Sequence, residues 1–263
     1  MGYGQLIKKL QNMNSKWYSF SFLLLLIFIW YVVSAMRVVP AFMLPSPLSV
    51  LQAFISDFPL LMRHTAASLL EAGIGLTSSV ICAFLISAIM DKNKFLYRAL
   101  YPILLLTQTI PIIAVAPLLV LWLGYGLAPK VTLIFLVCFF PITIGLLDGF
   151  RDVDPDAVVL LRSMGASEWN IFWQLKFPSA LPRFFSGLKI AVSYSIVSTV
   201  IAGWLGGSFG LGVYMMRVRR GFEFDKMFAV IFLVSALSLL LMKLTTMLEA
   251  KCTPWLERER KSR

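Results

Sequence analysis

Charge is scarce in this sequence: 14% of its 263 residues are charged, whereas 59% are hydrophobic. A chain with so few polar groups cannot coat the surface of a soluble globule. The formal net charge is +11, but the basic residues stand in short groups between long apolar runs, with no basic stripe interleaved with base-stacking aromatics. The composition therefore predicts a membrane protein and argues against nucleic acid as a partner.

Catalytic and metal-binding patterns are also missing. The chain contains no HExxH or GxxxxGK[ST] sequence. Its one histidine, His64, is predicted in a loop and has no clustered acidic neighbours, so it cannot build a usual metal site. Cys82, Cys138 and Cys252 form neither a CxxC pair nor a secreted-disulfide spacing. We therefore expect neither an enzyme nor a chain that binds a metal or cofactor itself.

Six apolar runs reach the length of about 20 residues that crosses roughly 30 Å of hydrocarbon. These candidate spans are Trp17–Ala35, Ala67–Met90, Ala99–Gly124, Val131–Phe150, Leu188–Leu205 and Phe228–Leu248. The first could instead be a cleaved secretory signal, since lysines precede it and Val33-Ser34-Ala35 could serve as a cleavage site. Its apolar run is longer than such signals have, and more spans follow. We predict an all-α integral membrane protein with about six transmembrane helices.

Lysine and arginine predict the orientation, because they accumulate on the cytoplasmic side. With the N-terminus inside, the internal segments hold fifteen of them and the external segments seven. This favours a multi-pass protein with both termini cytoplasmic, although the cluster MRVRRGFEFDK opposes the rule. The predicted organisation is 1–66 for the N-terminal segment, first span and external loop, 67–250 for the core, and 251–263 for a basic tail.

The longest internal loop, about 151–186, contains the unusual stretch LRSMGASEWNIFWQLKFPSALP. Asp154 and Asp156 flank Pro155, an arrangement that favours a helix start. Apolar residues then recur at helical spacing, and two proline residues are predicted to end the helix. The apolar residues are Met164, Ile171, Phe172, Leu175, Trp169 and Trp173, and the prolines are Pro178 and Pro182. We expect a short helix along the membrane that either docks on a protein or rests on lipid headgroups.

The order Gly165, nine residues, Leu175, one residue, Phe177-Pro178 resembles the cytoplasmic EAA loop of permease subunits of bacterial binding-protein-dependent ABC importers. Further stretches resemble the nitrate/sulfonate/taurine type: LPSPLSVLQAF, TIPIIAVAPLLVLWLGYG, FFPITIGLLDGFRDVDPD, RSMGAS and GSFGLGVYM. The resemblance implies a type I ABC importer permease (MetI-like) fold with a coupling helix that inserts into the ATP-binding subunit. The implied coupling residues are Arg162, Gly165, Ala166, Ser167, Trp169, Phe172 and Pro178.

Two departures from the family pattern stand out. Val159-Leu160-Leu161 replaces the usual Glu-Ala-Ala, so docking would depend on shape and apolar burial rather than on that glutamate. Gly203 stands where many relatives have an acidic residue, and no role of that acid is carried over.

The glycine-rich run GWLGGSFGLG, residues 203–212, follows an apolar span rather than a strand and lacks the lysine and adjoining hydroxyl residue that end a Walker sequence. Glycines here permit positive φ and close helix approach, which a turn at the external end of the fifth span would use. The resemblance implies an external gate, with Trp204, Gly207, Gly210 and Gly212 as its candidate residues.

Polar side chains inside the spans are costly unless they face protein or water. Hydroxyl residues can also hydrogen-bond neighbouring helices, so either role fits. The candidates for lining a translocation path are Gln108, Thr109, Tyr194 and Ser198. Thr107, Ser195 and Thr199 are polar residues next to them in the sequence. Pro111 and Pro117 should bend or break the third span near Gln108 and free backbone groups to line a cavity.

These features together predict a permease subunit that forms half of a homodimeric channel and works by alternating access. Its partners would be an ATP-binding subunit, which hydrolyses the ATP, an extracytoplasmic solute-binding protein, a second copy of itself and the lipid bilayer. A secondary transporter is the alternative, but no convincing repeat and no midplane carboxylate is found. A membrane-embedded enzyme would need a catalytic pair, and none stands out. Because basic residues are rare inside the spans, a neutral or aromatic heterocycle is preferred as the solute over a strong anion.

Overall fold

The computed structural model describes residues 3–40 and 42–255, excluding the side chains of 3–16 and 19. The chain forms two compact units. The smaller unit comprises the residues up to Phe58 with Arg217–Ile231, and the larger unit comprises Pro59–Met216 with Phe232 and the residues that follow it. The predicted basic tail extends beyond the described residues, since 256–263 lie outside them.

The smaller unit contains α1 (Tyr3–Ala35) and α2 (Pro47–Ser56). The side chain of Ser46 accepts a hydrogen bond from the Ser49 amide at 3.1 Å, and Pro47 occupies the first turn, so α2 has a favourable start. Lys226 lies 3.0 Å from a carboxylate oxygen of Glu223 and 3.3 Å from one of Asp57. Two acidic side chains therefore offset part of the basic cluster that opposed the predicted orientation.

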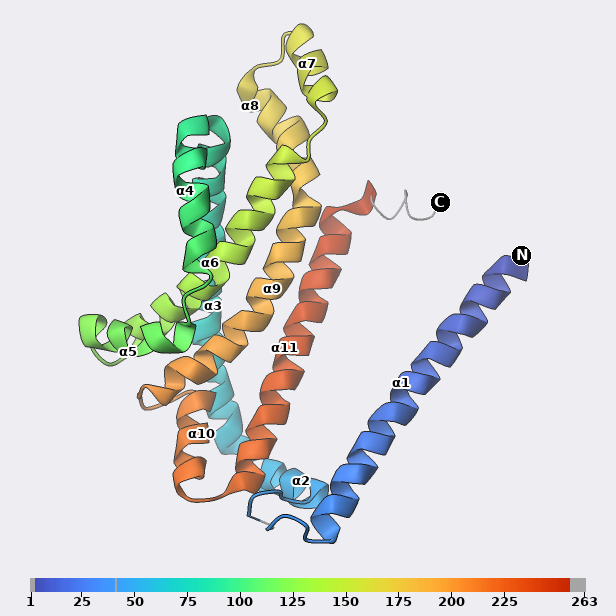
Figure 1. Ribbon diagram of the computed structural model, residues 1–263, viewed down its shortest axis with the longest axis vertical. Coiled ribbons are helices and arrows are strands. Elements are labelled where there is room, and N and C mark those ends of the chain that lie inside the picture. Colours follow the sequence, from blue (N-terminus) through green and yellow to red (C-terminus); the bar gives the residue numbers. More distant parts are fainter. Residues whose placement is uncertain (1–2, 41, 256–263) are drawn as a thin grey trace. The chain divides into compact units, whose positions relative to one another are not determined.

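The larger unit is built from long helices (Figure 1). Its elements are α3 (Phe58–Lys92), α4 (Lys94–Thr107), α5 (Ile112–Leu123), α6 (Leu127–Arg151), α7 (Pro155–Ser163), α8 (Glu168–Ile171), a π-turn (Phe172–Lys176) and α9 (Phe177–Trp204). The residues of α10 (Leu211–Arg220) and α11 (Phe224–Cys252) are divided between the two units.

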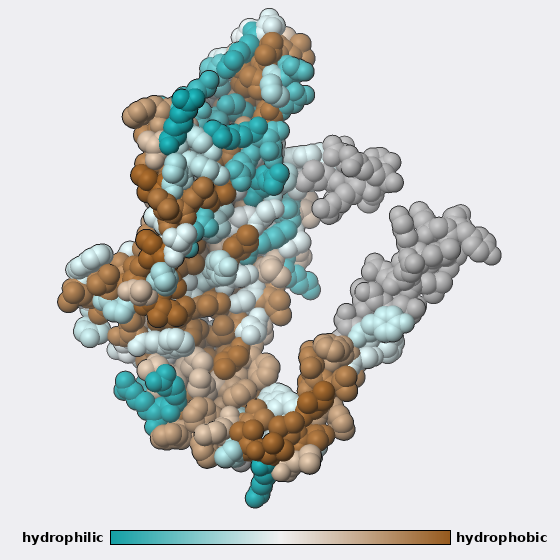
Figure 2. Space-filling view, viewed as in Figure 1, coloured by the Kyte–Doolittle hydropathy of each residue, from teal (hydrophilic) through white to brown (hydrophobic). Residues whose placement is uncertain are grey.

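Four helical segments among the described residues are long and apolar enough to cross a membrane: α3, α6, Glu168–Trp204 and α11. The bent pair α4–α5, taken together, is long and apolar enough to be a fifth span, and α1 contains the shorter apolar stretch Phe20–Ala35. Each of the six predicted spans thus falls on helix, which confirms an all-α, multi-pass membrane fold. Figure 2 shows hydrophobic side chains over much of α4 and α5, and hydrophilic ones gathered toward the end that bears α7 and α8.

The third span is broken, as was predicted from its proline residues. α4 ends at Thr107 and α5 begins after Pro111, with 101° between the two helices. Proline has no amide hydrogen and pushes the preceding residue toward extended backbone, so helix is disfavoured at Pro111 and just before it. Pro117, in contrast, lies inside α5 without ending it.

α6 and α9 pack together through residues without bulky side chains. A Cβ at Gly145 would lie 2.7 Å from the Arg183 carbonyl oxygen, and one at Gly149 would lie 2.7 Å from the Ala180 Cα. A Cβ at Gly187 would collide with the Pro141 carbonyl oxygen. Such small-residue contacts let two backbones approach closely within a membrane. These two helices form the frame that positions the cavity and the projecting segment described below.

The fifth span begins earlier than predicted, because Pro178 and Pro182 do not end the helix. α8, the π-turn and α9 form one continuous segment of 37 residues. The Phe177 amide donates to the Phe172 carbonyl, five residues back, and Pro178 then occupies the first turn of α9. A proline costs little in a first turn, since its missing amide hydrogen has no helical partner there.

Candidate functional site

The predicted coupling segment is a short helix followed by a sharply defined turn. Asp154 accepts a hydrogen bond from the Asp156 amide at 2.9 Å and caps α7 as predicted. At the other end, the Gly165 amide donates to the Arg162 carbonyl and the Ala166 amide to the Leu161 carbonyl, both at 3.0 Å. This is a Schellman motif, which needs a positive φ at its glycine, and Gly165 has φ +83°. A Cβ at Gly165 would meet nothing of this chain within 4 Å.

The start of α8 is fixed to the end of α7. Ser167 caps α8 by accepting a hydrogen bond from the Asn170 amide at 3.3 Å. Arg162 Nε donates to Glu168 Oε1 at 2.8 Å, and this hydrogen bond raises the pKa of the Arg162 guanidinium. Both side chains are exposed, so the bridge contributes little stability and serves mainly to orient the turn.

Apolar side chains gather on the outside of this segment. Four of them are exposed and are called the tip patch: Val159, Leu160, Met164 and Trp169. Figure 1 shows α7 and α8 projecting beyond the ends of α6 and α9. Trp173 is partly exposed and stacks edge-on against Trp169, with 5.6 Å between ring centroids. The Val-Leu-Leu sequence that replaces Glu-Ala-Ala thus supplies two residues of the patch.

Phe172 does not belong to this exposed surface, and the prediction that it is presented to a partner is wrong. It is 5% exposed, and its ring centroid lies 5.3 Å from that of Phe150 on α6. The π-turn begins at Phe172 and turns this ring into the core. Pro178 likewise lies in the first turn of α9 rather than on α7 or α8.

A cavity of about 590 Å³ lies between the α4–α5 break, α6 and α9. It brings together Thr107, Gln108 and Tyr194, two of which were predicted to line a path. Thr109 does not line it, and its hydroxyl donates to the Leu106 carbonyl at 2.7 Å. Ser198 is buried away from the cavity. The break at Pro111 is therefore what places Gln108 opposite α9.

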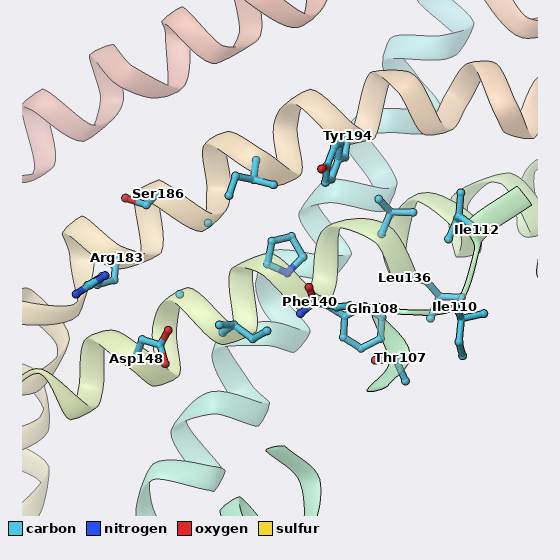
Figure 3. A pocket seen from close by; sticks show the side chains of 16 residues that line it. Thr107, Gln108, Ile110, Ile112, Leu136, Phe140, Asp148, Arg183, Ser186 and Tyr194 are labelled. Carbon is cyan, nitrogen blue, oxygen red and sulfur yellow. The ribbon is translucent and has the colours of Figure 1, made fainter. Parts of the chain in front are cut away.

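The walls of this cavity are largely apolar, and its charged side chains lie at one end. Figure 3 shows Asp148 and Arg183 at that end, Ile110 and Ile112 at the other, and Gln108 between the two ends. Arg183 also holds Asp152, with hydrogen-bonding distances of 2.8 and 2.9 Å. The middle of the cavity can therefore donate and accept hydrogen bonds without presenting a net charge.

The predicted gate loop, between α9 and α10, is held by a buried ion pair that sequence reasoning missed. Lys130 Nζ lies 2.7 Å from Glu71 Oε1 and donates to the Phe209 carbonyl at 3.0 Å. Both charged side chains are only 7% exposed. A Cβ at Gly207 would lie 3.1 Å from Lys130 Nζ, so the loop passes directly over the ammonium group.

Two further α3 side chains hold the same loop. The Leu211 amide donates to Ser68 Oγ at 2.9 Å. His64 Nδ1 lies 2.9 Å from the carbonyl oxygen and 3.1 Å from the amide nitrogen of Gly210, so whether it donates or accepts depends on the ring tautomer. His64 is buried within α3, and its predicted loop position is wrong because α3 already begins at Phe58. Together with Glu71 these residues are spaced i, i+4 and i+7 on one helix face.

The remaining candidate gate residues differ in their surroundings. Trp204 ends α9 and is partly exposed. A Cβ at Gly212 would collide with the Val200 carbonyl, and one at Gly203 would lie 2.8 Å from the Gly212 Cα. A side chain at Gly203 would therefore require the start of α10 to shift.

A bundle of membrane-spanning helices around a hydrogen-bonding cavity, with a projecting apolar segment at one end, defines a membrane transport subunit rather than an enzyme. The chain belongs to the family described as binding-protein-dependent transport system inner membrane component, which matches residues 75–253. Membership in this family of ABC importer permeases implies an ATP-binding subunit and a binding protein as partners.

Curated relatives cover nearly the whole chain. It is 36% identical to the formylaminopyrimidine transport permease protein ThiX of Halalkalibacterium halodurans, over 90% of this chain and 95% of that protein. It is 31% identical to the riboflavin transport system permease protein RibX of Chloroflexus aurantiacus, over 89% of this chain and 88% of that protein. It is 26% identical to the taurine transport system permease protein TauC of Escherichia coli, over 94% of this chain and 96% of that protein.

A solved structure supports the fold. The inward-facing MetNI methionine ABC transporter matches with a TM-score of 0.66 and 18% identity, over 75% of this chain and 98% of that chain. This match confirms the expected MetI-like fold, and relatives that include taurine, sulfonate and nitrate permeases confirm the expected nitrate/sulfonate/taurine type.

Proposed function

We propose that the tip patch is the surface through which this permease couples to its ATP-binding subunit. The observation that carries this proposal is a rigidly built apolar turn on an otherwise hydrophilic end of the larger unit. A helix resting on lipid headgroups needs an apolar face but no fixed turn geometry. Here a capped helix start and a Schellman motif define one shape, as a protein-binding cleft would require, and the exposed Arg162–Glu168 bridge orients the turn.

The 590 Å³ cavity is proposed as part of the translocation path, with Gln108 and Tyr194 as its hydrogen-bonding residues. In this arrangement the chain is one half of a homodimer in the bacterial cell membrane, with both termini cytoplasmic. The partner subunit binds and hydrolyses ATP, and this chain binds no cofactor. ATP-driven movement at the tip patch passes through α7 and α8 to α9, which lines the cavity and ends at the gate loop.

The chemistry of the cavity favours an uncharged, planar solute. Its centre offers an amide and a phenol among apolar walls, and its charged residues stand at one end. Such a site suits a nitrogen heterocycle, which needs hydrogen bonds and apolar contact, better than a strong anion. The relatives named for formylaminopyrimidine and riboflavin transport support this solute class.

The coupling proposal is tested by replacing Gly165 with aspartate and with asparagine. Both residues have nearly the same size, and asparagine tolerates the left-handed backbone that φ +83° requires. In a docked interface, aspartate also buries a charge at a cost of several kcal/mol. We expect the Gly165→Asp chain to reach the membrane normally, to lose its ATPase on co-purification and to support no ATP-driven uptake.

The Gly165→Asn chain is the matched control and should retain more of the ATPase. If the aspartate variant keeps its ATPase and transports normally, the segment does not dock, and a helix resting on lipid headgroups becomes the better account.

A further inference from the structure

A second cavity, of about 400 Å³, lies near the π-turn, where α3 and α6 end and α4 begins. Its lining residues are Met90, Asp91, Lys94, Tyr97, Arg98, Leu147, Arg151 and Lys176. Four of these side chains are basic and one is acidic. The cavity is separate from the proposed translocation path, since the two share no lining residue.

Internal contacts satisfy only part of this positive charge. Lys176 Nζ lies 2.7 Å from Asp91 Oδ2, so the one carboxylate of the cavity is already paired. The Arg151 guanidinium lies 3.5 Å from the centroid of the Tyr97 ring, a cation–π contact that orients it without neutralising it. Lys94 and Arg98 are exposed and make no ion pair with any described side chain. Three cations are therefore available to an anion.

The surroundings of the cavity indicate an anion that carries apolar chains. Phe95, between the two free cations in sequence, is 78% exposed, and Ile89 on the last turns of α3 is 54% exposed. The cavity lies beside Lys92, at one end of the candidate membrane span α3. A free anion would gain nothing from exposed apolar side chains, whereas a lipid places its phosphate at the boundary and its acyl chains beside the helices.

We propose that this cavity binds the phosphate group of an anionic phospholipid. The phosphate oxygens accept hydrogen bonds from Lys94, Arg98 and Arg151, and the guanidinium groups suit such oxyanions by their planar donor geometry. The acyl chains lie along the exposed apolar residues of α3 and α4. The bound lipid would brace the α3–α4 connection against the π-turn, through Lys176 and its partner Asp91.

The test uses the complete transporter in lipid nanodiscs of phosphatidylcholine with increasing phosphatidylglycerol, with bound lipids measured by native mass spectrometry. The test variant is Lys94→Gln with Arg98→Gln. Both side chains are exposed and unpaired, so their loss leaves the fold intact. The control variant is Lys243→Gln with Lys251→Gln, which removes the same charge from exposed positions on α11. Inorganic phosphate is added in a separate arm as a competitor.

The wild-type transporter is expected to retain phosphatidylglycerol in preference to phosphatidylcholine. The test variant should bind it about thirtyfold more weakly, which corresponds to ~2 kcal/mol at ~1.4 kcal/mol per tenfold and to about 1 kcal/mol for each cation. The control variant should match the wild type, and inorganic phosphate should not displace the lipid.

Three outcomes would overturn the proposal. Equal loss of lipid from both variants would indicate a general charge effect. Displacement of lipid by inorganic phosphate would assign the cavity to a free anion. Loss of the ATP-binding subunit from the test variant, with lipid retention unchanged, would assign these cations to the protein partner. None of these outcomes bears on the tip patch, whose test depends on Gly165.

Discussion

The ion pair between Glu71 and Lys130 should hold the gate loop in place, and replacing Lys130 with methionine tests this. The change removes the cation 2.7 Å from Glu71 and the donor to the Phe209 carbonyl, while it leaves Glu71 buried. Removing one partner of a buried pair costs about 3–5 kcal/mol, because the other charge is left without compensation. Lys130→Met alone should therefore lower the free energy of unfolding by about that amount.

The paired variant Glu71→Met with Lys130→Met should recover most of the loss. Replacing both members of a buried pair with apolar residues is often close to neutral. What remains is the lost hydrogen bond to Phe209, worth about 0.5–1.5 kcal/mol. The expected coupling energy between the two positions is thus about 2 kcal/mol or more.

The free energies are measured by equilibrium unfolding of the wild type, both single variants and the double variant in mixed micelles, as a double-mutant cycle. Limited proteolysis of the loop at 205–210 gives a local measurement, and Lys130→Met should increase cleavage there. Additive single-variant effects, or a Lys130→Met chain as stable and as resistant as the wild type, would refute the reasoning.

Three further predictions follow from single positions. Gly210→Val forces a β-branched side chain onto φ +121°, so uptake should fall at normal membrane abundance, and normal uptake would count against a gating role. Gly187→Leu places a side chain against the Pro141 carbonyl and should separate α6 from α9, with the amount of folded permease falling at least severalfold on size-exclusion chromatography; an unchanged folded fraction would contradict the close packing. Gln108→Leu removes the central amide of the cavity and should raise the KM for uptake severalfold with ATPase association unchanged, whereas an unaltered KM would exclude this residue from the path.

The helices and the break in the third span were predictable because each depends on a local property. Apolar length alone marks a span, and Pro111 disfavours helix at itself and at the residue before it through purely local effects. The start of α7 at Asp154 is also a local matter, since the cap and the first-turn proline act within three residues.

The misplaced features depend on contacts between distant residues. Pro178 was expected to end a helix, but the π-turn at Phe172–Lys176 places Pro178 in the first turn of α9, where the helix continues. Phe172 shares its helical spacing with exposed residues, and only packing against Phe150 decides that it is buried. Glu71 and Lys130 are 59 positions apart, so their pairing required the fold. A carboxylate inside an apolar run was nevertheless a signal, because a buried charge needs a partner.

ATP-driven uptake tests the account of this chain as an importer permease most directly. Proteoliposomes would contain the permease with its ATP-binding subunit, enclose ATP and Mg²⁺, and receive radiolabelled solute with the binding protein outside. The account predicts accumulation that requires enclosed ATP, requires the binding protein, survives dissipation of ion gradients and is abolished by Gly165→Asp. Accumulation by the permease alone, driven by an ion gradient and indifferent to ATP, would contradict it.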